Sequence, residues 1–335
     1  MNDRAVELLE QYELGVLRTR KGRGAILCDT ERGCLILKEY TGSLDRIELQ
    51  NRLLKQITAC GQVEVEAIVR NKEGSLLALD ENGARYILKT WQEGRECNIH
   101  EKEECMEAVR VLARLHESMT ISRDFLAKEE PAPGLPPVFS PGKEYDKHNK
   151  ELRRVRKYLQ QKGQKTWFEL SLLKAFDVYL EQAVSVTERW LEYNDQIASP
   201  VDEERISFCH GDYQYHNILF GDNGWFLVNF ERYVRDNPVR DLYLLLRKLL
   251  EKGNWQPALG AGLLEAYEKE RPLSKRDRVD LYYRLAYPEK FWKIVNFYYN
   301  SRKSWIPGKN QEKLERLLAQ EKEKQQFLRE VFCGI

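Results

Sequence analysis

Short runs of apolar and β-branched residues alternate with glycine and charged residues through positions 15–91, and this pattern predicts strands. The runs are Gly15–Arg20, Gly24–Cys28, Cys34–Tyr40, Val65–Arg70, Ser75–Leu79 and Arg85–Trp91. Between the third and fourth runs, Leu44–Cys60 has apolar residues at the spacing of an amphipathic helix. The pattern therefore predicts a strand-rich N-terminal region that contains a helix.

The hydrophobic period becomes helical in the rest of the chain. The predicted helices are Lys102–Ser118, Tyr145–Gln161, Thr166–Tyr193 and a charged terminal helix from about Gln311 to Phe332. Residues 130–142 carry five prolines and two glycines, which predicts a loop. A strand-rich lobe at residues 1–93 followed by a helical lobe at residues 94–335 is an α+β arrangement. It is the layout of the two-lobed protein-kinase-like fold.

Charge and hydropathy exclude several classes of protein. The chain has 335 residues, with 54 lysines and arginines against 53 aspartates and glutamates, so its net charge is close to zero. That balance gives no field that would favour a nucleic acid or an anionic membrane as a partner. The chain has no run of about 18 apolar residues that would span a membrane. Its charged N-terminus, MNDRAVELLEQYEL, predicts a helix and is unlike a secretory signal.

The cysteines are odd in number, scattered, and never arranged as C-x-x-C. They are Cys28, Cys34, Cys60, Cys97, Cys105, Cys209 and Cys333. This usage is typical of reduced thiols in a cytosol and argues against a disulfide framework or a zinc site. The five histidines also lack the spacing of metal ligands.

The segment FCHGDYQYHN at residues 208–217 is the strongest chemical signal in the chain. Gly211 permits a tight loop, and Asp212 precedes Asn217 by five residues, so both side chains can face one cleft. In a purely structural alternative, Asp212 caps a turn and Asn217 binds the backbone.

HGDYQYHN resembles the catalytic loop of the aminoglycoside phosphotransferases and choline kinases. The resemblance implies a catalytic role for His210 and Asp212, with Asp212 as the base. It assigns Asn217 to the bound nucleotide and its metal. ATP and Mg²⁺ are therefore the cofactors that the resemblance implies.

Phosphoryl transfer in such proteins also uses a lysine on the third strand, which a helix glutamate orients. Lys38, in CLILKEY, lies on the third predicted strand and precedes a predicted helix. Lys89, in YILKTW, is the rival, but a turn follows it. We therefore favour Lys38 as the phosphate-binding lysine. Glu48 is its best partner on the helix, although Asp45 also lies close in sequence.

The run WFLVNFER at residues 225–232 predicts a strand and carries the one departure from the resemblance. Where active relatives have a metal-binding Asp, this chain has Asn229. With Asn217 and Asn229 as the metal ligands, the protein would supply no negative charge to Mg²⁺, which prefers carboxylates. Glu231 would restore that charge only if the strand continues, because residues two apart share a face only on a strand. The substitution indicates impaired catalysis.

Asp241 opens a predicted helix, where a carboxylate is well placed as an N-terminal cap. The resemblance implies that this Asp also braces the catalytic loop. Both roles are structural, so Asp241 is not counted as catalytic.

Two other features would suit an anion, and each has a plainer interpretation. The turn Arg20–Gly24 would lie over phosphates or form an ordinary hairpin turn. A basic cluster in a predicted helix would bind an anionic partner or form a solvated face. Its members are Lys147, Lys150, Arg153, Arg154, Arg156 and Lys157.

Three separated segments resemble the CotS-type spore coat proteins of endospore-forming bacteria. They are TWQEGREC at 90–97, ARLHESM at 113–119, and the aromatic run that begins YPEKFWKIVNFYYN at 287. The aromatic residues between positions 282 and 305 also predict a packed core. The resemblance covers about residues 12–330. It implies a spore coat protein that is made in the mother-cell cytoplasm and has other coat proteins as partners.

Two hypotheses follow. The chain is a kinase-like coat component that acts by binding and has impaired catalysis, as Asn229 and the coat-protein resemblance indicate. Alternatively, it is an active ATP-dependent phosphotransferase on a small hydroxyl compound or a coat component, as Lys38, His210, Asp212 and Asn217 indicate.

Overall fold

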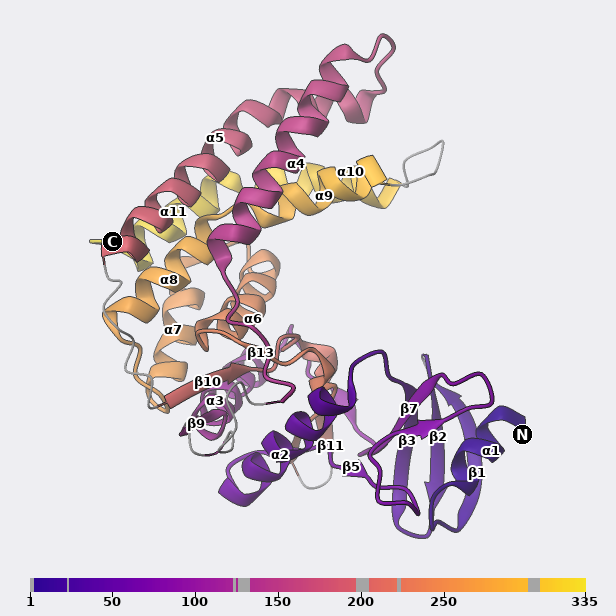
Figure 1. Ribbon diagram of the computed structural model, residues 1–335. Helices are drawn as coiled ribbons and strands as arrows, with labels where there is room; N and C mark the ends of the chain where they lie inside the picture. The colour runs from indigo at the N-terminus through magenta and orange to yellow at the C-terminus, as the bar shows by residue number, and fades with distance from the viewer. Residues whose placement is uncertain are drawn as a thin grey trace. The chain divides into compact units, whose positions relative to one another are not determined.

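The computed structural model describes residues 3–22, 24–122, 125, 133–196, 205–221, 224–300 and 308–335. The chain divides into two compact units, and Figure 1 labels their helices and most of their strands. The first unit comprises residues 1–138, 203–245 and 266–271. The second unit comprises residues 139–202, 246–265 and 272–335.

An antiparallel sheet forms the N-terminal part of the first unit. Among the described residues its strand order is β1-β2-β3-β7-β5, and β6 pairs with β7 (Figure 1). The bounds are β1 Val16–Gly22, β2 Ala25–Thr30, β3 Gly33–Glu39, β5 Ile68–Val69, β6 Ala78–Leu79 and β7 Arg85–Thr90. The strands that the sequence predicts in this region are therefore present, with β5 and β6 shortened to two residues each.

The two faces of this sheet have different roles. Helix α1 (Asp3–Glu10) supplies apolar side chains that pack with those of one face, including Leu35, Leu37 and Leu88. Because side chains alternate along a strand, the next residues point to the other face. Those residues include Lys38 on β3 and Lys89 on β7. The face away from α1 therefore carries both lysines that the sequence singles out.

Two smaller sheets hold the HGD segment. Their orders are β4-β12-β11-β8 and β13-β10-β9. The bounds are β4 Glu64–Val65, β8 Arg95–Glu96, β9 Thr120–Ser122, β10 Arg205–Cys209, β11 Ile218–Gly221, β12 Gly224–Leu227 and β13 Val234–Arg235. The HGD loop thus leaves β10 and returns through a 3₁₀ turn, η2 (Tyr215–Asn217), into the hairpin of β11 and β12.

The predicted strand Val65–Arg70 is corrected by the structure. It is split into β4, which pairs in parallel with β12, and β5, which pairs with β7. Glu66 lies between the two strands, with its backbone N–H donating to Leu227 O at 3.1 Å. A buried carboxylate needs partners, and those of Glu66 lie on two different segments, so the chain changes sheet at this residue.

Helices α2 (Leu44–Cys60) and α3 (Lys102–Ser118) have the bounds predicted from their apolar spacing. Ser43 caps α2 by accepting a hydrogen bond from Arg46 N, and Gly61 ends it in the left-handed conformation at φ 67°. These two residues are of the types that favour helix ends, and they fix both ends of α2 locally.

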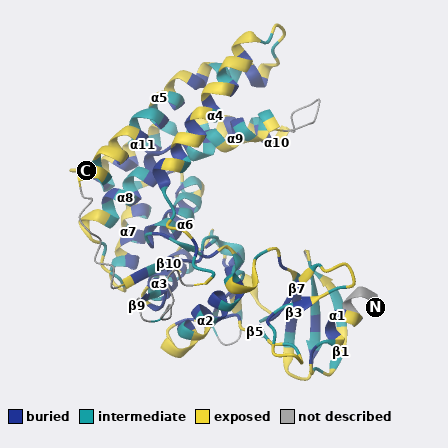
Figure 2. Cartoon of the chain, in the orientation of Figure 1, coloured by how far each residue is buried: buried dark blue, intermediate teal, exposed yellow. Residues whose placement is uncertain are grey.

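Helices form the second unit. Its elements are α4 (Pro141–Gln161), α5 (Trp167–Gln196), α8 (Lys275–Ala286), α9 (Glu289–Asn300), α10 (Gly308–Ala319) and α11 (Glu321–Val331). Helices α6 (Val239–Lys252) and α7 (Pro257–Glu268) lie partly in each unit. In Figure 2 these helices carry buried residues on one side and exposed residues on the other.

The core of this unit includes Phe291. The centroid of its ring lies 5.2 Å from that of Phe176 and 4.5 Å from that of Tyr179. This confirms the packed aromatic core over the described part of residues 282–305, because 301–307 lie outside the described residues.

Two predicted helix bounds in this unit are corrected. Helix α4 begins at Pro141 and so starts within the predicted loop, because a proline is tolerated in the first turn of a helix. The predicted terminal helix is broken at Gln320 into α10 and α11. There the Gln320 side chain donates to the backbone carbonyl of Glu251 at 2.9 Å, a tertiary contact that no local pattern reveals.

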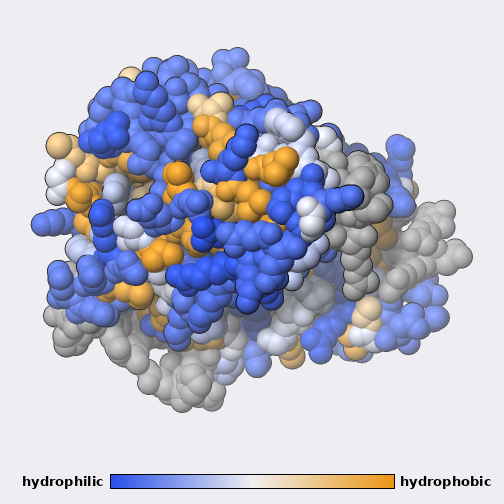
Figure 3. All heavy atoms as spheres, turned by 90° about the horizontal axis from the view of Figure 1, so that it is seen from above, coloured by the Kyte–Doolittle hydropathy of each residue, from blue (hydrophilic) through white to orange (hydrophobic). Residues whose placement is uncertain are grey.

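Most of the described surface visible in Figure 3 is hydrophilic, with hydrophobic residues gathered near the middle of this face among hydrophilic ones. No helix among the described residues has the length and apolar character that crossing a membrane requires.

We expect Phe291→Ala to lower the free energy of unfolding by about 3–5 kcal/mol, because the fully buried ring leaves a cavity. Phe297→Ala is the matched control on the same helix, since Phe297 is 50% exposed. Its effect should stay within about 0.5 kcal/mol. Urea unfolding measures both, and equal losses would contradict this description of the core.

Candidate functional site

The HGD loop requires a glycine at its centre. Gly211 has φ 81°, in the left-handed region that favours glycine. A Cβ added there would lie 1.9 Å from the backbone oxygen of Arg232. The close approach brings the loop against the turn that follows β12, η3 (Phe230–Arg232).

Asp241, in the first turn of α6, holds this loop through its backbone. Its completely buried carboxylate accepts hydrogen bonds from His210 N at 2.5 Å and from Gly211 N at 3.0 Å. Burial by itself would raise the pKa of Asp241, but contacts with His116 and His210 and the Gly211 N–H outweigh it and lower that pKa. The carboxylate therefore stays ionised and braces the loop, as the sequence resemblance implies.

The His210 ring joins the loop to the end of β12. Its Nδ1 accepts from Asp212 N at 3.2 Å, and its Nε2 lies 2.9 Å from Val228 O. This pair of contacts requires the neutral tautomer with the proton on Nε2. The Asp212 side chain is 21% exposed, accepts from Gln214 Nε2 at 2.5 Å and lies 4.0 Å from Arg232 Nη1. Asp212 thus presents a partly accessible carboxylate, while His210 is enclosed.

The two asparagines that the resemblance assigns to a metal contact each other. Asn229 Nδ2 donates to Asn217 Oδ1 at 2.9 Å, and Asn217 Nδ2 donates to Asp212 O at 2.8 Å. Lys38 Nζ donates to Asn229 Oδ1 at 3.3 Å. The structure therefore brings Lys38, Asn217, Asn229 and the Asp212 backbone into one group.

Asn229 does not lie on a strand, which corrects the prediction for WFLVNFER. Strand β12 ends at Leu227, Asn229 has φ 69° and ψ 53°, and η3 follows it. Asparagine is among the residues that tolerate this left-handed conformation. The argument that Asn229 and Glu231 share a strand face therefore does not apply, and a different geometry places Glu231.

Glu48 is not brought to Lys38. Its carboxylate forms a bidentate ion pair with Arg70 on the exposed side of α2. Arg70 Nη1 donates to Oε1 at 3.1 Å and Nη2 donates to Oε2 at 2.9 Å. The carboxylate beside Lys38 is that of Glu231, at 3.5 Å from Nζ.

The other lysine, Lys89, is part of a buried charge network. Its ammonium donates to Glu66 at 2.8 Å and to Glu231. Burial by itself lowers the pKa of Lys89, but the two carboxylates outweigh it and raise that pKa. Burial likewise raises the pKa of Glu231, while Lys89 and Lys38 reverse this and lower it to about 2. Lys89 and Glu231 are therefore charged at neutral pH.

Glu66 also binds the turn that carries Asn229. Its carboxylate accepts from Asn229 N at 2.8 Å and from Phe230 N at 3.1 Å. Sequence reasoning missed Glu66. The sequence nevertheless contains a signal for this ion pair. Glu66 and Lys89 each interrupt an apolar strand-like run, and buried charges occur almost always in pairs. The pattern does not say which acid meets which base.

The two anion-binding candidates have ordinary surroundings in the structure. Gly22 pairs with Ala25 across the turn between β1 and β2, while Arg23 lies outside the described residues. In the basic cluster on α4, Lys150 pairs with Asp146 at 2.5 Å. Arg156 contacts Asp177, and Arg154 stacks on a tyrosine ring.

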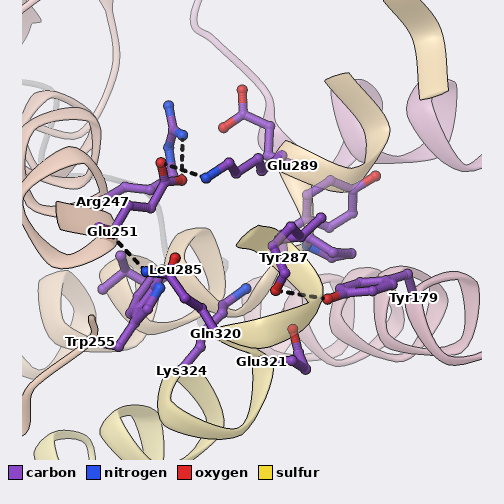
Figure 4. A pocket seen from close by; sticks show the side chains of 13 residues that line it. Tyr179, Arg247, Glu251, Trp255, Leu285, Tyr287, Glu289, Gln320, Glu321 and Lys324 are labelled. Atoms are coloured by element: carbon purple, nitrogen blue, oxygen red, sulfur yellow. Dashed lines mark hydrogen bonds and ion pairs between the residues drawn. The ribbon is translucent and has the colours of Figure 1, made fainter. Parts of the chain in front are cut away.

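The second unit has a hollow of its own, shown in Figure 4. Aromatic walls come from Tyr179, Trp255 and Tyr287, and the buried Lys324 donates to Ala286 O at 3.2 Å. Glu251 contacts Arg247 and Lys290 there, at 3.0 Å and 2.9 Å. The charges of the cationic and acidic side chains that line this hollow cancel, so its net charge favours neither an anionic nor a cationic ligand.

Several solved structures that resemble this chain are phosphotransferases or kinases. An aminoglycoside phosphotransferase from Alicyclobacillus acidocaldarius matches with a TM-score of 0.83 at 17% identity, covering 98% of this chain and 95% of that one. A spectinomycin phosphotransferase in an AMP-bound complex matches with a TM-score of 0.64 at 14% identity, covering 99% and 98%. An amicoumacin kinase in complex with AMP-PNP and Ca²⁺ gives 0.59 at 12% identity, covering 97% and 94%. The protein is therefore α+β with the kinase-like fold of the aminoglycoside phosphotransferases, as the sequence predicts.

The family follows from the sequence itself. The family model described as "Spore coat putative kinase YutH" matches residues 6–331, and the chain belongs to this family. Spore coat protein S of Bacillus subtilis (strain 168) is 30% identical over 127 residues, which are 37% of this chain. The match spans 36% of that relative, about a third of its length. The resemblance to spore coat proteins is thus confirmed at the level of the family.

We expect Gly211→Ala to lower the free energy of unfolding by about 2 kcal/mol or more, because the new Cβ adds left-handed strain and a clash with the backbone. Gly163→Ala is the control, since a Cβ there meets nothing within 4 Å. Thermal unfolding compares the two, and equal midpoints would disprove the close approach of the loop to η3.

We expect Lys89→Met to cost about 3–5 kcal/mol of stability, because it leaves the carboxylates of Glu66 and Glu231 buried without their shared cation. Lys38→Met should cost about 1 kcal/mol or less, since the Lys38 side chain is 33% exposed. Urea unfolding at neutral pH checks this, and a larger loss at Lys38 would refute the assignment of Lys89 as the structural lysine.

Proposed function

We propose that this protein is a spore coat component that uses a kinase fold to bind a nucleotide, with impaired phosphoryl transfer. The observation that carries the proposal is the contact between Asn217 and Asn229, which stand where the resemblance assigns metal ligands. The groups that would bind the phosphates are Lys38, Asn217 and the HGD loop. Hydrogen bonds through Asn229 and the Asp212 backbone keep them close together.

The donor set fits a resident Mg²⁺ poorly. Mg²⁺ is held in such sites by one or two carboxylates together with phosphate oxygens. Here both candidate side chains are amides, and each amide oxygen already accepts a hydrogen bond. Glu231 is the nearby carboxylate, and two lysines already neutralise it. This charge arrangement supports binding over turnover.

A second candidate function is ATP-dependent phosphorylation of a small hydroxyl compound or a coat component. It is favoured by the partly accessible carboxylate of Asp212 and by the brace that Asp241 gives the loop. A phosphotransferase needs such a carboxylate to orient the acceptor hydroxyl.

The family and the curated relative support a place in the spore coat, with other coat proteins as partners. Synthesis in the mother-cell cytoplasm is part of the same proposal. The nucleotide is proposed from the fold, because two proteins of similar structure are seen in complexes with AMP and with AMP-PNP.

The test is calorimetric titration of the full chain with ATP, with Mg²⁺ and with EDTA. We expect wild type to bind ATP with an affinity that Mg²⁺ changes little. Asn229→Asp restores a carboxylate and should gain about tenfold in Mg²⁺-dependent affinity. Asn296→Asp on α9 is the matched control and should gain nothing.

Turnover separates the two candidate functions. Under the first proposal, wild type releases no phosphate from ATP above background. Hydrolysis by wild type that Asp212→Asn abolishes would establish the phosphotransferase instead. Absence of ATP binding in both wild type and Asn229→Asp would reject both candidates.

A further inference from the structure

Lys38 and Lys89 are neighbours on one face of the N-terminal sheet. In the pairing of β3 with β7, Lys38 lies opposite Ile87 and Lys89 lies opposite Ile36. The two lysines are therefore diagonal neighbours on the same face, within reach of each other's long side chains. Two ammonium groups so placed repel each other unless an anion lies near both.

Glu231 supplies that anion. Its Oε1 atom contacts Lys89 Nζ and lies 3.5 Å from Lys38 Nζ. The side chain of Glu231 is only 16% exposed. It comes from η3, directly after the Asn229 turn that Glu66 holds in place.

The two lysines have different freedom to bind a ligand. Lys89 is enclosed between Glu66 and Glu231, with 1% of its side chain exposed. Lys38 is 33% exposed and contacts Asn229 Oδ1 and Glu231. An ammonium has three donors, so at least one N–H of Lys38 remains for a ligand. Among the described residues, the side-chain carboxylate that forms an ion pair with Lys38 is that of Glu231, and Glu48 on α2 pairs with Arg70.

We propose that Glu231 is the positioning residue that orients Lys38 toward a bound phosphate, acting as a counter-ion and not as a metal ligand. In phosphotransferases a helix glutamate performs this task. Here the turn after β12 supplies the carboxylate, so the lysine is tied to the segment that carries Asn229. This inference rests on the proposed nucleotide binding.

The first test is ATP affinity with Mg²⁺ and with EDTA for Glu231→Gln, Glu48→Gln, Lys38→Met and the double variant Lys38→Met/Glu231→Gln. We expect Glu231→Gln to weaken binding about fivefold under both conditions. Glu48→Gln, the same change on α2, should have no effect. The double variant should bind no more weakly than Lys38→Met alone. If Glu231→Gln lowers ATP affinity only in the presence of Mg²⁺, Glu231 is a metal ligand and the proposal fails. Equal losses of ATP affinity in Glu48→Gln and Glu231→Gln would also overturn it.

The second test does not depend on nucleotide. A double-mutant cycle in urea unfolding should give a measurable coupling between Lys38 and Glu231, and none between Lys38 and Glu48. If ATP fails to bind to wild type while this coupling is present, the proposed function fails and the ion-pair assignment stands. If the coupling is absent, the positioning role is wrong. Should Glu231→Gln not fold, Glu231→Asp replaces it, because it keeps a negative charge for the buried Lys89 while the shorter side chain weakens the contact with Lys38, which is the longer of the two.

Discussion

The buried ammonium of Lys89 is the constraint on which the site depends. A charge without solvent is stable only with partners, and Glu66 and Glu231 supply them from two distant segments. Strand β7, the break between β4 and β5, and the turn after β12 are thereby held together. The same Glu66 carboxylate accepts the N–H groups of Asn229 and Phe230, so this charge network also sets the backbone that presents Asn229.

A second buried carboxylate does similar work for the HGD loop. Asp241 holds the loop by its backbone, and Gly211 lets it pass close to η3. The two networks meet where His210 contacts Val228 O. Buried carboxylates thus hold the backbone of the HGD loop and of the Asn229 turn by hydrogen bonds, while the side chains of Asn217 and Asn229 are neutral amides. The hydrogen bonds that hold the Asn229 turn go from its backbone N–H groups to Glu66. They do not involve the side chain at position 229.

Local pattern was sufficient wherever local chemistry decides the structure. The bounds of α2 and α3 followed from apolar spacing, with clear caps at both ends of α2, and the HGD loop was recognised from its residues and spacing. Prediction failed where a distant partner decides. The predicted strand Val65–Arg70 is interrupted at Glu66, whose carboxylate contacts two other segments. The predicted terminal helix is interrupted at Gln320, whose side chain contacts the backbone of Glu251. The expected pairing of Lys38 with Glu48 failed for the same reason, since Arg70 lies nearer in space.

The sequence by itself determined the α+β kinase-like fold, the position of the HGD loop and the presence of asparagine at position 229, because each depends on residues close together along the chain. Only the tertiary structure decided which carboxylate accompanies which lysine. Lys38, Lys89, Glu66 and Glu231 come from four separate segments, and their pairing is settled by burial and by the register of β3 against β7. Interactions between charges act through space at distances of a few ångströms, and separation along the chain carries no record of them.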